Sequence, residues 1–277
     1  MDIGWIRKVE LVSISEGIRR ALDGQPFDPR NNKEGAFSIL KNDIYTLTHS
    51  GQEQKNVLAE EKEHLAEYLS DISHQLKTPI SSILLMTELM ADAPEKTKQE
   101  FLQSIKKEIR HMEWLVTALL KMAKLDSSVT NFHREEIPVS LLLGEALKSV
   151  EIILDIRNQT ICLKNDLSLY CDKKWTGEAL INLLKNASDF SVENSEILVD
   201  CGENPLYHWI SITDTGEGLK KEQIARLFRR FESSGKENGY GIGLPLALSI
   251  MRGQNGDIAV SPGGHGSGAT FFMKFYK

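Results

Sequence analysis

The sequence lacks long apolar runs, and no hydrophobic stretch approaches the roughly 20 residues needed to cross a bilayer. Its first residues, Met1-Asp-Ile-Gly-Trp5, are too polar for a secretory signal peptide. Basic blocks are also missing, since 33 Lys and Arg stand against 39 Asp and Glu, for a formal net charge of −6. A nucleic-acid binder needs a basic face, so this balance argues against nucleic acid as a partner. We expect a soluble chain.

Cysteine is scarce as well. Cys162, Cys171 and Cys201 are odd in number and show no C-x-x-C spacing. This pattern favours reduced thiols in a cytoplasmic domain over a disulfide framework or a zinc site. The 277 residues are enough for about two domains, and hydrophobic and charged fractions of 41% and 26% are ordinary for a protein with buried cores.

Two long amphipathic helices dominate the first half of the sequence. Apolar residues recur every three or four positions over 52–90 and again over 95–124, with a break at Ala91-Asp-Ala-Pro94 between them. Two antiparallel helices with wide apolar stripes cannot cover both stripes alone. The pattern therefore favours a dimeric four-helix bundle over a hairpin packed on its own chain. Upstream, 9–22 and 37–47 are predicted as two short helices.

The second half of the sequence has a different hydrophobic pattern. A polar, turn-like stretch at 125–131 marks an interdomain linker, and short alternating runs mixed with helical patterns follow it. The expected helices are 140–156, 174–187, 220–228 and 244–252. The expected strands are 160–163, 169–171, 196–201, 209–213, 257–260 and 270–275. This mixture predicts an α/β sandwich, one sheet with helices packed on one face.

His74 stands out on the first long helix. At about 100° per residue it points away from the apolar stripe and into water. Pro79 has no N–H to offer the carbonyl of Gln75, and Thr78 lies one turn beyond His74 on the same side. A solvated imidazole can attack phosphorus at neutral pH. An exposed helical histidine is nevertheless most often a plain surface residue, which is how we interpret His64 and His111.

Three polar features of the second half point to a nucleotide. Asn182 and Asn186 lie four apart on one helix face, and amide oxygens can ligate Mg²⁺ beside phosphate oxygens. Asp214-Thr-Gly216-Glu-Gly218 directly follows a strand, so that the carboxylate can accept from an exocyclic amine while the glycines permit a tight turn. A helix is preceded by Gly239-Tyr-Gly241-Ile-Gly243-Leu244, and the free N–H groups at the start of such a helix can form a phosphate-binding site. The polar stretch 229–238 between them is expected to act as a lid.

In this order, these segments resemble the motifs of the cytoplasmic half of a two-component sensor histidine kinase. The matching boxes are Ser73–Pro79 (H), Asn182–Asn186 (N), Asp214–Gly218 (G1), Leu227–Phe231 (F), Gly239–Leu244 (G2) and Gly266–Phe271 (G3). The resemblance implies an α+β protein, a helical hairpin followed by a sandwich of the histidine-kinase, gyrase and Hsp90 ATPase type. We expect a HAMP-like juxtamembrane segment (1–50), a dimerisation and phosphotransfer hairpin (51–126), a linker (127–136) and a catalytic domain (137–277).

The resemblance also implies a mechanism. ATP would bind the sandwich with Mg²⁺ on Asn186 and Asn182, while Asp214 reads the adenine amine. The glycines at 216, 218, 239, 241 and 243, together with Leu244, would surround the nucleotide, and Arg230 would neutralise charge. The γ-phosphoryl group would pass to His74 and then to an aspartate of a response regulator. The protein would be a homodimer, cytoplasmic here and anchored through membrane segments missing from this chain.

Two departures keep alternatives open. The family usually has an acid after the histidine, where Gln75 can only hydrogen-bond, and Asp189 with Phe190 replaces a basic residue and a tyrosine. Thr78 keeps the family's position for orienting water in dephosphorylation of the regulator. One alternative is therefore a kinase-impaired nucleotide-binding regulator or phosphatase. Others are a related ATPase without phosphohistidine and a non-enzymatic coiled-coil adaptor.

Overall fold

The computed structural model describes residues 36–91, 93–126, 130–232, 241–263 and 268–277, apart from some side chains of the first helix. It divides into two compact units whose border lies between Thr78 and Pro79. Within the described residues no helix combines the length and the apolar character that a membrane span requires.

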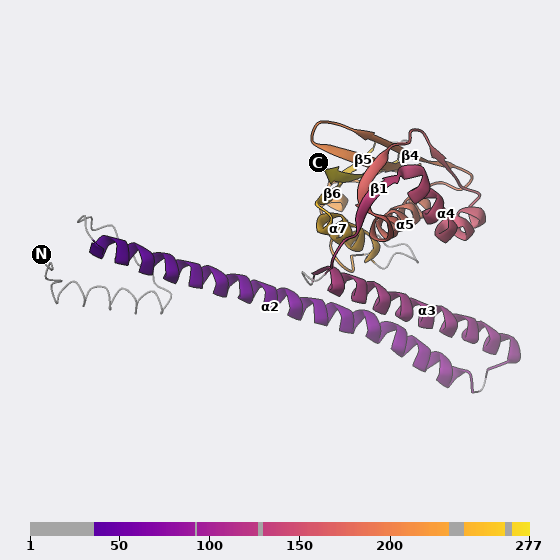
Figure 1. The fold of residues 1–277 in the computed structure, drawn as a ribbon. Coiled ribbons are helices and arrows are strands. Elements are labelled where there is room, and N and C mark those ends of the chain that lie inside the picture. Colours follow the sequence, from indigo (N-terminus) through magenta and orange to yellow (C-terminus); the bar gives the residue numbers. More distant parts are fainter. Residues whose placement is uncertain (1–35, 92, 127–129, 233–240, 264–267) are drawn as a thin grey trace, which may run out of the picture. The chain divides into compact units, whose positions relative to one another are not determined.

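Helix α2 covers Ala36–Leu89 and helix α3 covers Glu95–Asp126. The short helix expected at 37–47 is thus the start of α2, while the one expected at 9–22 lies outside the described residues. Pro79 is inside α2 and buried. Figure 1 shows α3 running antiparallel to the last turns of α2, which is the predicted hairpin.

The sandwich is built on a five-stranded sheet with the order β2-β4-β5-β7-β6. Its strands are β2 (Thr160–Leu163), β4 (Glu196–Glu203), β5 (Tyr207–Thr213), β6 (Gly256–Ser261) and β7 (Thr270–Tyr276). The β2–β4 pair is parallel, and the other pairs are antiparallel. All five strands were predicted within a few residues, and alternation is clearest in β7, where Phe271, Met273 and Phe275 are buried.

A second sheet has two strands, of which the one at 169–171 was predicted and its partner was missed. Strand β1 (Arg134–Pro138) pairs antiparallel with β3 (Ser168–Asp172), with Ile137 opposite Leu169. Strand β1 begins inside the stretch predicted to be linker. Its sequence, Arg-Glu-Glu-Ile-Pro, gives no alternation to detect, because Ile137 is the only strongly apolar residue it buries.

Three helices cover one face of the large sheet, as Figure 1 shows: α4 (Val139–Ile156), α5 (Lys173–Phe190) and α7 (Gly243–Gly253). Their buried leucines, isoleucines and alanines meet the inward side chains of the strands to form the core. Helix α6 (Lys221–Ile224) is shorter than the predicted 220–228. After Ile224 the backbone continues in turns. The Arg226 N–H donates to the Gln223 carbonyl, and the Arg229 N–H donates to the Arg226 carbonyl, each three residues back along the chain.

A buried polar network fixes the start of α5. Asp172 caps the helix by accepting from the Trp175 N–H at 2.9 Å, and its other carboxylate oxygen accepts from the His133 N–H at 2.8 Å. Gln254, at the end of α7, accepts from the Asp172 N–H at 2.6 Å and donates to the Thr176 hydroxyl at 3.2 Å. The network joins the segment after α3 to the ends of two core helices.

The C-terminal half of α3 packs against the sandwich within the unit that starts at Pro79. Leu115, Ala118, Leu119 and Met122 are buried, and the Lys121 ammonium lies 2.7 Å from the Glu178 carboxylate on α5. The sequence placed Leu115 and Leu119 on one stripe with Leu102, Ile109, Val116 and Leu120, but these four remain exposed. The apolar surface of α3 therefore has two faces, one of which is covered by the sandwich.

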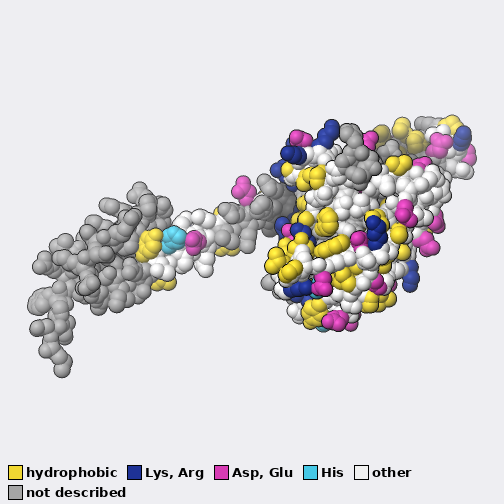
Figure 2. Space-filling view, turned by 90° about the horizontal axis from the view of Figure 1, so that it is seen from above, with side chains coloured by type: hydrophobic (Ala, Val, Ile, Leu, Met, Phe, Trp, Pro, Cys, Tyr) yellow, Lys and Arg dark blue, Asp and Glu magenta, His cyan; other side chains and the backbone are white. Residues whose placement is uncertain are grey.

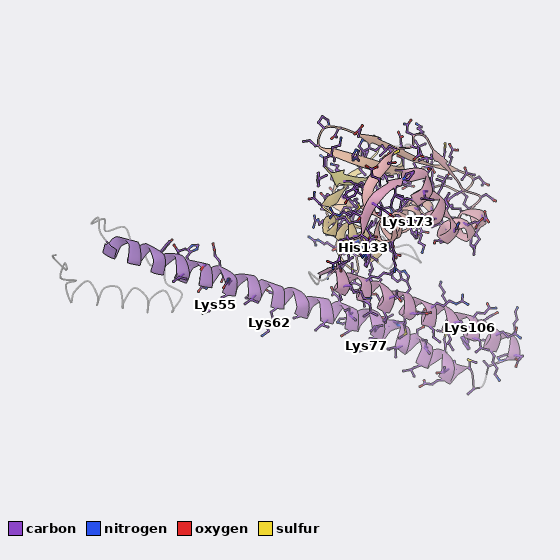
Figure 3. All side chains as sticks on the ribbon, viewed as in Figure 1. Lys55, Lys62, Lys77, Lys106, His133 and Lys173 are labelled. Carbon is purple, nitrogen blue, oxygen red and sulfur yellow. The ribbon has the colours of Figure 1, made fainter. Side chains whose placement is uncertain are left out.

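Surface charge and thiols agree with the composition. Figure 2 shows basic and acidic side chains interspersed with apolar ones on the visible face, and Figure 3 shows Lys106 on α3 and Lys173 at the start of α5. The three cysteines are free thiols, and burial raises the pKa of Cys171 and of Cys201. Thiolate chemistry at neutral pH is therefore disfavoured at both positions.

Candidate nucleotide site

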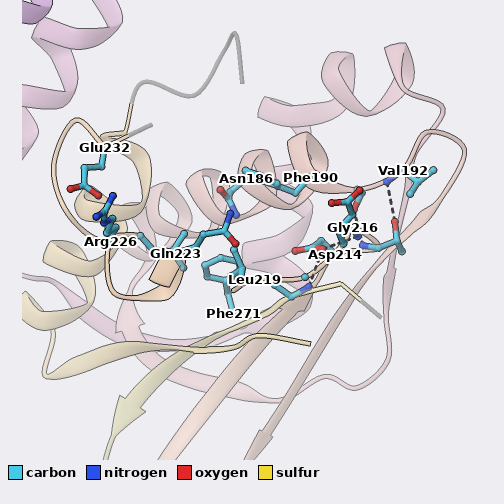
Figure 4. A pocket seen from close by; sticks show the side chains of 16 residues that line it. Asn186, Phe190, Val192, Asp214, Gly216, Leu219, Gln223, Arg226, Glu232 and Phe271 are labelled. Carbon is cyan, nitrogen blue, oxygen red and sulfur yellow. Dashed lines mark hydrogen bonds between the residues drawn. The ribbon is translucent and has the colours of Figure 1, made fainter. Parts of the chain in front are cut away.

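A cavity of about 1020 Å³ opens between the end of α5 and the loops that follow β5 and α6. Its volume is at the upper end of the range usual for small-molecule pockets. Apolar side chains form most of its walls, and a few polar groups converge on it, as Figure 4 shows. The apolar walls are Phe190, Val192, Leu219, Leu227, Ala269 and Phe271. The polar lining includes Asn186, Ser191, Asp214, Thr215, Glu217, Gln223, Arg226 and Glu232.

Asp214 is a polar group of this cavity that is only 4% exposed. It directly follows β5, and its Oδ1 accepts from the N–H groups of Gly216 (2.9 Å) and Ala269 (3.0 Å). These bonds set the carboxylate's orientation before any ligand arrives. A carboxylate held in this way suits an amine donor on a flat ring, in agreement with the role that the sequence predicts for it.

Two glycines make this geometry possible. A Cβ on Gly216 would lie 2.5 Å from the carbonyl oxygen of Phe190, and one on Gly268 would lie 1.8 Å from that of Asp214. Gly268 also has a φ of 59°, in the left-handed region that glycine adopts at little cost. Gly216 and Gly218 both line the cavity, as the sequence predicts for the G1 segment.

Hydroxyl groups tie the two loops of the cavity wall together. The Thr215 N–H donates to the Ser191 Oγ at 3.1 Å, and the Thr215 hydroxyl donates to the Ser195 Oγ at 2.8 Å. Ser195 in turn donates to the Val192 carbonyl at 2.6 Å. The loop after α5 is thereby fixed to the loop after β5, which places Ser191, Val192 and Thr215 on one wall.

The two predicted asparagines differ in their surroundings. Asn186 lines the cavity, whereas Asn182 is absent from its lining. The Asn182 amide nitrogen donates to the Glu178 carbonyl at 2.9 Å, and its Oδ1 would lie 3.0 Å from a Cβ on Gly243. Asn182 therefore faces the N-terminus of α7.

The glycine-rich segment is described only in part, because Gly239 lies outside the described residues. Gly241 has a φ of 66°, and Gly243 and Leu244 begin α7. The Gly241 carbonyl accepts from the Phe231 N–H at 2.9 Å, and Phe231 itself has a φ of 63°. Phe231 and Gly241 thus lie side by side, and most of the expected lid (229–238) lies outside the described residues. None of Gly241, Gly243 and Leu244 is among the residues that line the cavity as described.

The basic residue at the cavity is Arg226, which the sequence reasoning missed. Arg230, chosen from its place in the F box, is half-buried and is not part of the lining. Arg226 stands one residue before Leu227, the first residue of the F box, which lines the cavity too. The sequence signal that could have identified Arg226 was a basic side chain directly beside this box. Figure 4 shows Arg226 and Glu232 together at one side of the cavity.

His74 belongs to the other unit and is exposed on α2, as predicted. The Thr78 hydroxyl donates to the His74 carbonyl at 3.4 Å, which ties it to the helix one turn away. Gln75 is half-buried, and Thr78 is exposed. An accessible imidazole on a helix is what attack on a phosphoryl group requires.

A divalent cation fits this donor set only together with a ligand. Among the described residues, no cluster of three or more His, Cys, Asp or Glu could hold a metal ion by itself. Mg²⁺ commonly takes one or two protein oxygens and completes its shell with phosphate oxygens and water. The Asn186 amide at the cavity can supply such an oxygen, so the residues present are compatible with Mg²⁺ carried in by a polyphosphate.

Comparison with known families agrees with this geometry. Residues 64–128 match the His Kinase A (phospho-acceptor) domain, and residues 171–277 match the histidine kinase-, DNA gyrase B- and HSP90-like ATPases. The first match contains His74, and the second contains Asn186 and Asp214. The chain belongs to the sensor histidine kinases. It carries a phosphoacceptor domain and an ATP-binding catalytic domain of the type that the sequence predicts.

Individual relatives give the same result. This histidine kinase chain is 30% identical over 229 residues to the sensor protein SrrB of Staphylococcus aureus. The aligned region covers 76% of this chain and 38% of SrrB. The chain thus spans about two fifths of that relative's length. The fold resembles that of the Acinetobacter baumannii histidine kinase AdeS, with a TM-score of 0.60 and 22% identity over 73% of this chain and 97% of AdeS.

A second solved structure, histidine kinase ThkA in complex with response regulator protein TrrA, gives a TM-score of 0.63 and 20% identity. The similarity covers 82% of this chain and 66% of that one. At this level of identity, the two structures establish the fold of this kinase, a helical hairpin followed by an α/β sandwich.

Proposed function

We propose that this chain transfers the γ-phosphoryl group of ATP to His74. The observation that carries the proposal is the fixed Asp214 carboxylate in a cavity of about 1020 Å³, in a chain whose phosphoacceptor domain exposes a histidine. Asp214 would accept from the adenine amine, and the apolar walls, Phe190 and Phe271 among them, would enclose the ring. Arg226, at the cavity, would offset phosphate charge, with Arg230 as the second candidate.

The start of α7 would bind the phosphates. The first N–H groups of a helix have no intrahelical partner, and its positive dipole end attracts anions. Gly241, Gly243 and Leu244 would present their backbone to the triphosphate, with Gly239 on the same segment. Asn186 would hold Mg²⁺, and we assign Asn182 to it as well because its Oδ1 faces Gly243. The ion would screen charge on the phosphate oxygens.

His74 would act as the nucleophile, with its reacting nitrogen unprotonated. Gln75 cannot take a proton, so the proton of the attacking imidazole would pass to water or to another base. Thr78 is held one turn from His74 and would orient water for dephosphorylation of the regulator. Because phosphoryl transfer depends mainly on positioning, the catalytic domain must bring the γ-phosphate to His74.

We propose a response regulator and a second copy of this chain as the partners. The complex of ThkA with TrrA supports the first by analogy of fold. The second is supported by Leu102, Ile109 and Val116, which lie one heptad apart on α3 with 45–52% of their surface exposed. On the end of α2, Ile80 and Leu84 are 43% and 57% exposed. A four-helix bundle would bury these side chains.

For the domain borders we retain the segments 1–50 and 51–126, but we shorten the predicted linker (127–136) to 127–133 and start the catalytic domain, predicted as 137–277, at Arg134 in β1. The first segment would connect the hairpin to an upstream signalling part, and we place the chain at the cytoplasmic side of a membrane-anchored sensor. Cell fractionation of the full-length protein tests this placement.

The test of the activity is labelling with γ-phosphate-labelled ATP and Mg²⁺. Wild-type protein should acquire an acid-labile, base-stable label, while His74→Gln and Asn186→Ala should not. A label that survives in His74→Gln would overturn His74 as the acceptor. Steady ATP hydrolysis that survives in His74→Gln, without any label on the wild type, would favour a related ATPase.

The motif departure at Gln75 favours a second candidate, a regulator that binds nucleotide and works mainly as a phosphatase. That candidate predicts ATP binding without label on His74, and loss of phosphate from a phosphorylated response regulator. Thr78→Ala should abolish this loss, because the hydroxyl would orient the water.

A further inference from the structure

The last turn of α5 carries a negative charge close to the proposed triphosphate site. Asp189 follows Asn186 by three residues, so the two side chains are neighbours on the helix. A carboxylate in this turn is unfavourable in two ways, because the C-terminal end of a helix is itself negative and because phosphates repel it. Something must offset this charge if the cavity is to bind ATP well.

Arg157, in the turn after α4, contacts this acid. Its Nη2 lies 3.2 Å from the Asp189 Oδ1, and its Nη1 donates to the carbonyls of Ser188 (3.1 Å) and Asp189 (3.4 Å). The two charged side chains are 29% and 28% exposed, so water screens the pair only in part. One guanidinium therefore neutralises the acid and occupies two carbonyls at the end of the helix.

The uncharged side chain of Gln159 fixes the backbone of the same turn. It is 5% exposed, and its amide donates to the carbonyls of Ser188 (3.2 Å), Ser191 (3.4 Å) and Val192 (3.1 Å). Its Oε1 accepts from the Ser188 hydroxyl at 2.6 Å. Because Gln159 fixes the backbone here, the main-chain position of the turn does not depend on Arg157 alone.

We propose that Arg157 is a positioning residue for nucleotide binding, which holds the Asp189 carboxylate at the outer side of α5 and cancels its charge toward the triphosphate. The inference rests on the proposed function, since it requires ATP in this cavity. Arg157 lies before residue 171, where the match to the ATPase family starts.

The experiment compares ATP, ADP and adenosine, with Mg²⁺ present, by isothermal titration calorimetry on the full chain. Arg157→Gln keeps a donor for the carbonyls but removes the charge. We expect it to weaken ATP binding roughly three- to tenfold, ADP less, and adenosine little, since repulsion scales with ligand charge. The double variant Arg157→Gln with Asp189→Asn should bind ATP as the wild type does.

Lys173→Gln is the matched control. It removes an ion pair with Glu145 (2.8 Å) on the same domain, whose side chains are 39% and 47% exposed and do not line the cavity. All three affinities should then stay at their wild-type values. Asp189→Asn alone keeps the bonds from Arg157 to the carbonyls, so it should fold and should bind ATP at least as tightly as the wild type.

Each result has one meaning. If the wild type does not bind ATP, the proposed function fails. If the wild type binds and Arg157→Gln is unchanged, or if all three ligands weaken equally without rescue by Asp189→Asn, the inference is overturned. Should Arg157→Gln not fold, Asp189→Asn decides, because weaker ATP binding by that variant would mean that the carboxylate assists the nucleotide.

Discussion

At the scale of single residues, the cavity depends on two backbone approaches that only glycine permits. We take Gly216 as the test, because the atom that its Cβ would meet at 2.5 Å is a backbone oxygen and cannot rotate away. Gly216→Ala should push Phe190 outward, lower the free energy of unfolding by about 1–3 kcal/mol and weaken ATP binding. Urea unfolding and calorimetric titration measure the two effects.

Gly144 is the control for this substitution. It is exposed on α4, and a Cβ there would have no atom within 4 Å. Gly144→Ala should raise the free energy of unfolding by about 0.5–1 kcal/mol, since alanine favours a helix interior. ATP affinity should not change. If both alanine variants behaved alike, the close approach at Gly216 would not be what shapes the cavity.

The sequence predicted polar residues of the site better than its walls. Asp214 and Asn186 were chosen because an acid followed by glycines after a strand, and two amides four residues apart on a helix face, have the chemistry that a nucleotide needs, and both line the cavity. Phe271 and Leu219 could not be separated from ordinary core residues. Arg226 was passed over because Arg230 was chosen from its place in the F box alone, and Arg226 lies just before that box.

At the scale of elements, helix α4 begins without a capping side chain of its own. Its N-cap is Pro138, and the Ser140 N–H is instead bound by the Oδ1 of Asp166, from the β2–β3 loop, at 3.0 Å. Hydrogen bonds from the Ser140 side chain and backbone lower the pKa of Asp166 below its ordinary 3.8. The carboxylate is therefore favoured in the folded state.

This cap predicts a dependence of stability on pH. Because the folded-state pKa is the lower one, the stabilisation is fully present above about pH 3.8 and is lost as the pH falls through the folded value. Asp166→Asn should be less stable than the wild type at pH 6, and the difference should shrink below pH 3.8. Ser140→Ala should show part of the effect. A difference that stays constant from pH 6 to pH 3 would contradict the assignment.

Most elements were predictable, and the exceptions have local causes. The five strands of the large sheet and helices α3, α4, α5 and α7 carry strong periodicity. Strand β1 is held by pairing to β3 and buries one strongly apolar side chain, so the sequence carries no period there. Helix α2 joins the short helix expected at 37–47 to the long one expected from Gln52, because the residues between them, 48–51, are compatible with a helix although they form no stripe.

At the scale of the whole molecule, the proposed dimer depends on the apolar face of α3 that the sandwich leaves uncovered. Ile109, 52% exposed, is near the middle of this face. Ile109→Glu would place a charge in the bundle and should raise the dimer dissociation constant at least about tenfold. Analytical ultracentrifugation across a concentration series measures this change.

Gln103→Glu, on an exposed position of the same helix, is the matched control and should leave the dimer intact. ATP binding should survive in both variants, because the cavity is built entirely from the sandwich. A wild-type protein that sediments as a monomer at every concentration would contradict the proposed dimer.

Helix α5 is anchored at both of its ends by side chains from elsewhere, Asp172 and Gln254 at the start and Gln159 and Arg157 at the finish. The wall of the cavity to which this helix contributes Asn186 and Phe190 therefore acts as a stiff template. Competitive inhibitors should gain selectivity when their shape matches this wall closely, whereas bulky substituents directed at it should weaken binding. Substituents are better varied on the side of the cavity formed by Gln223 and Arg226.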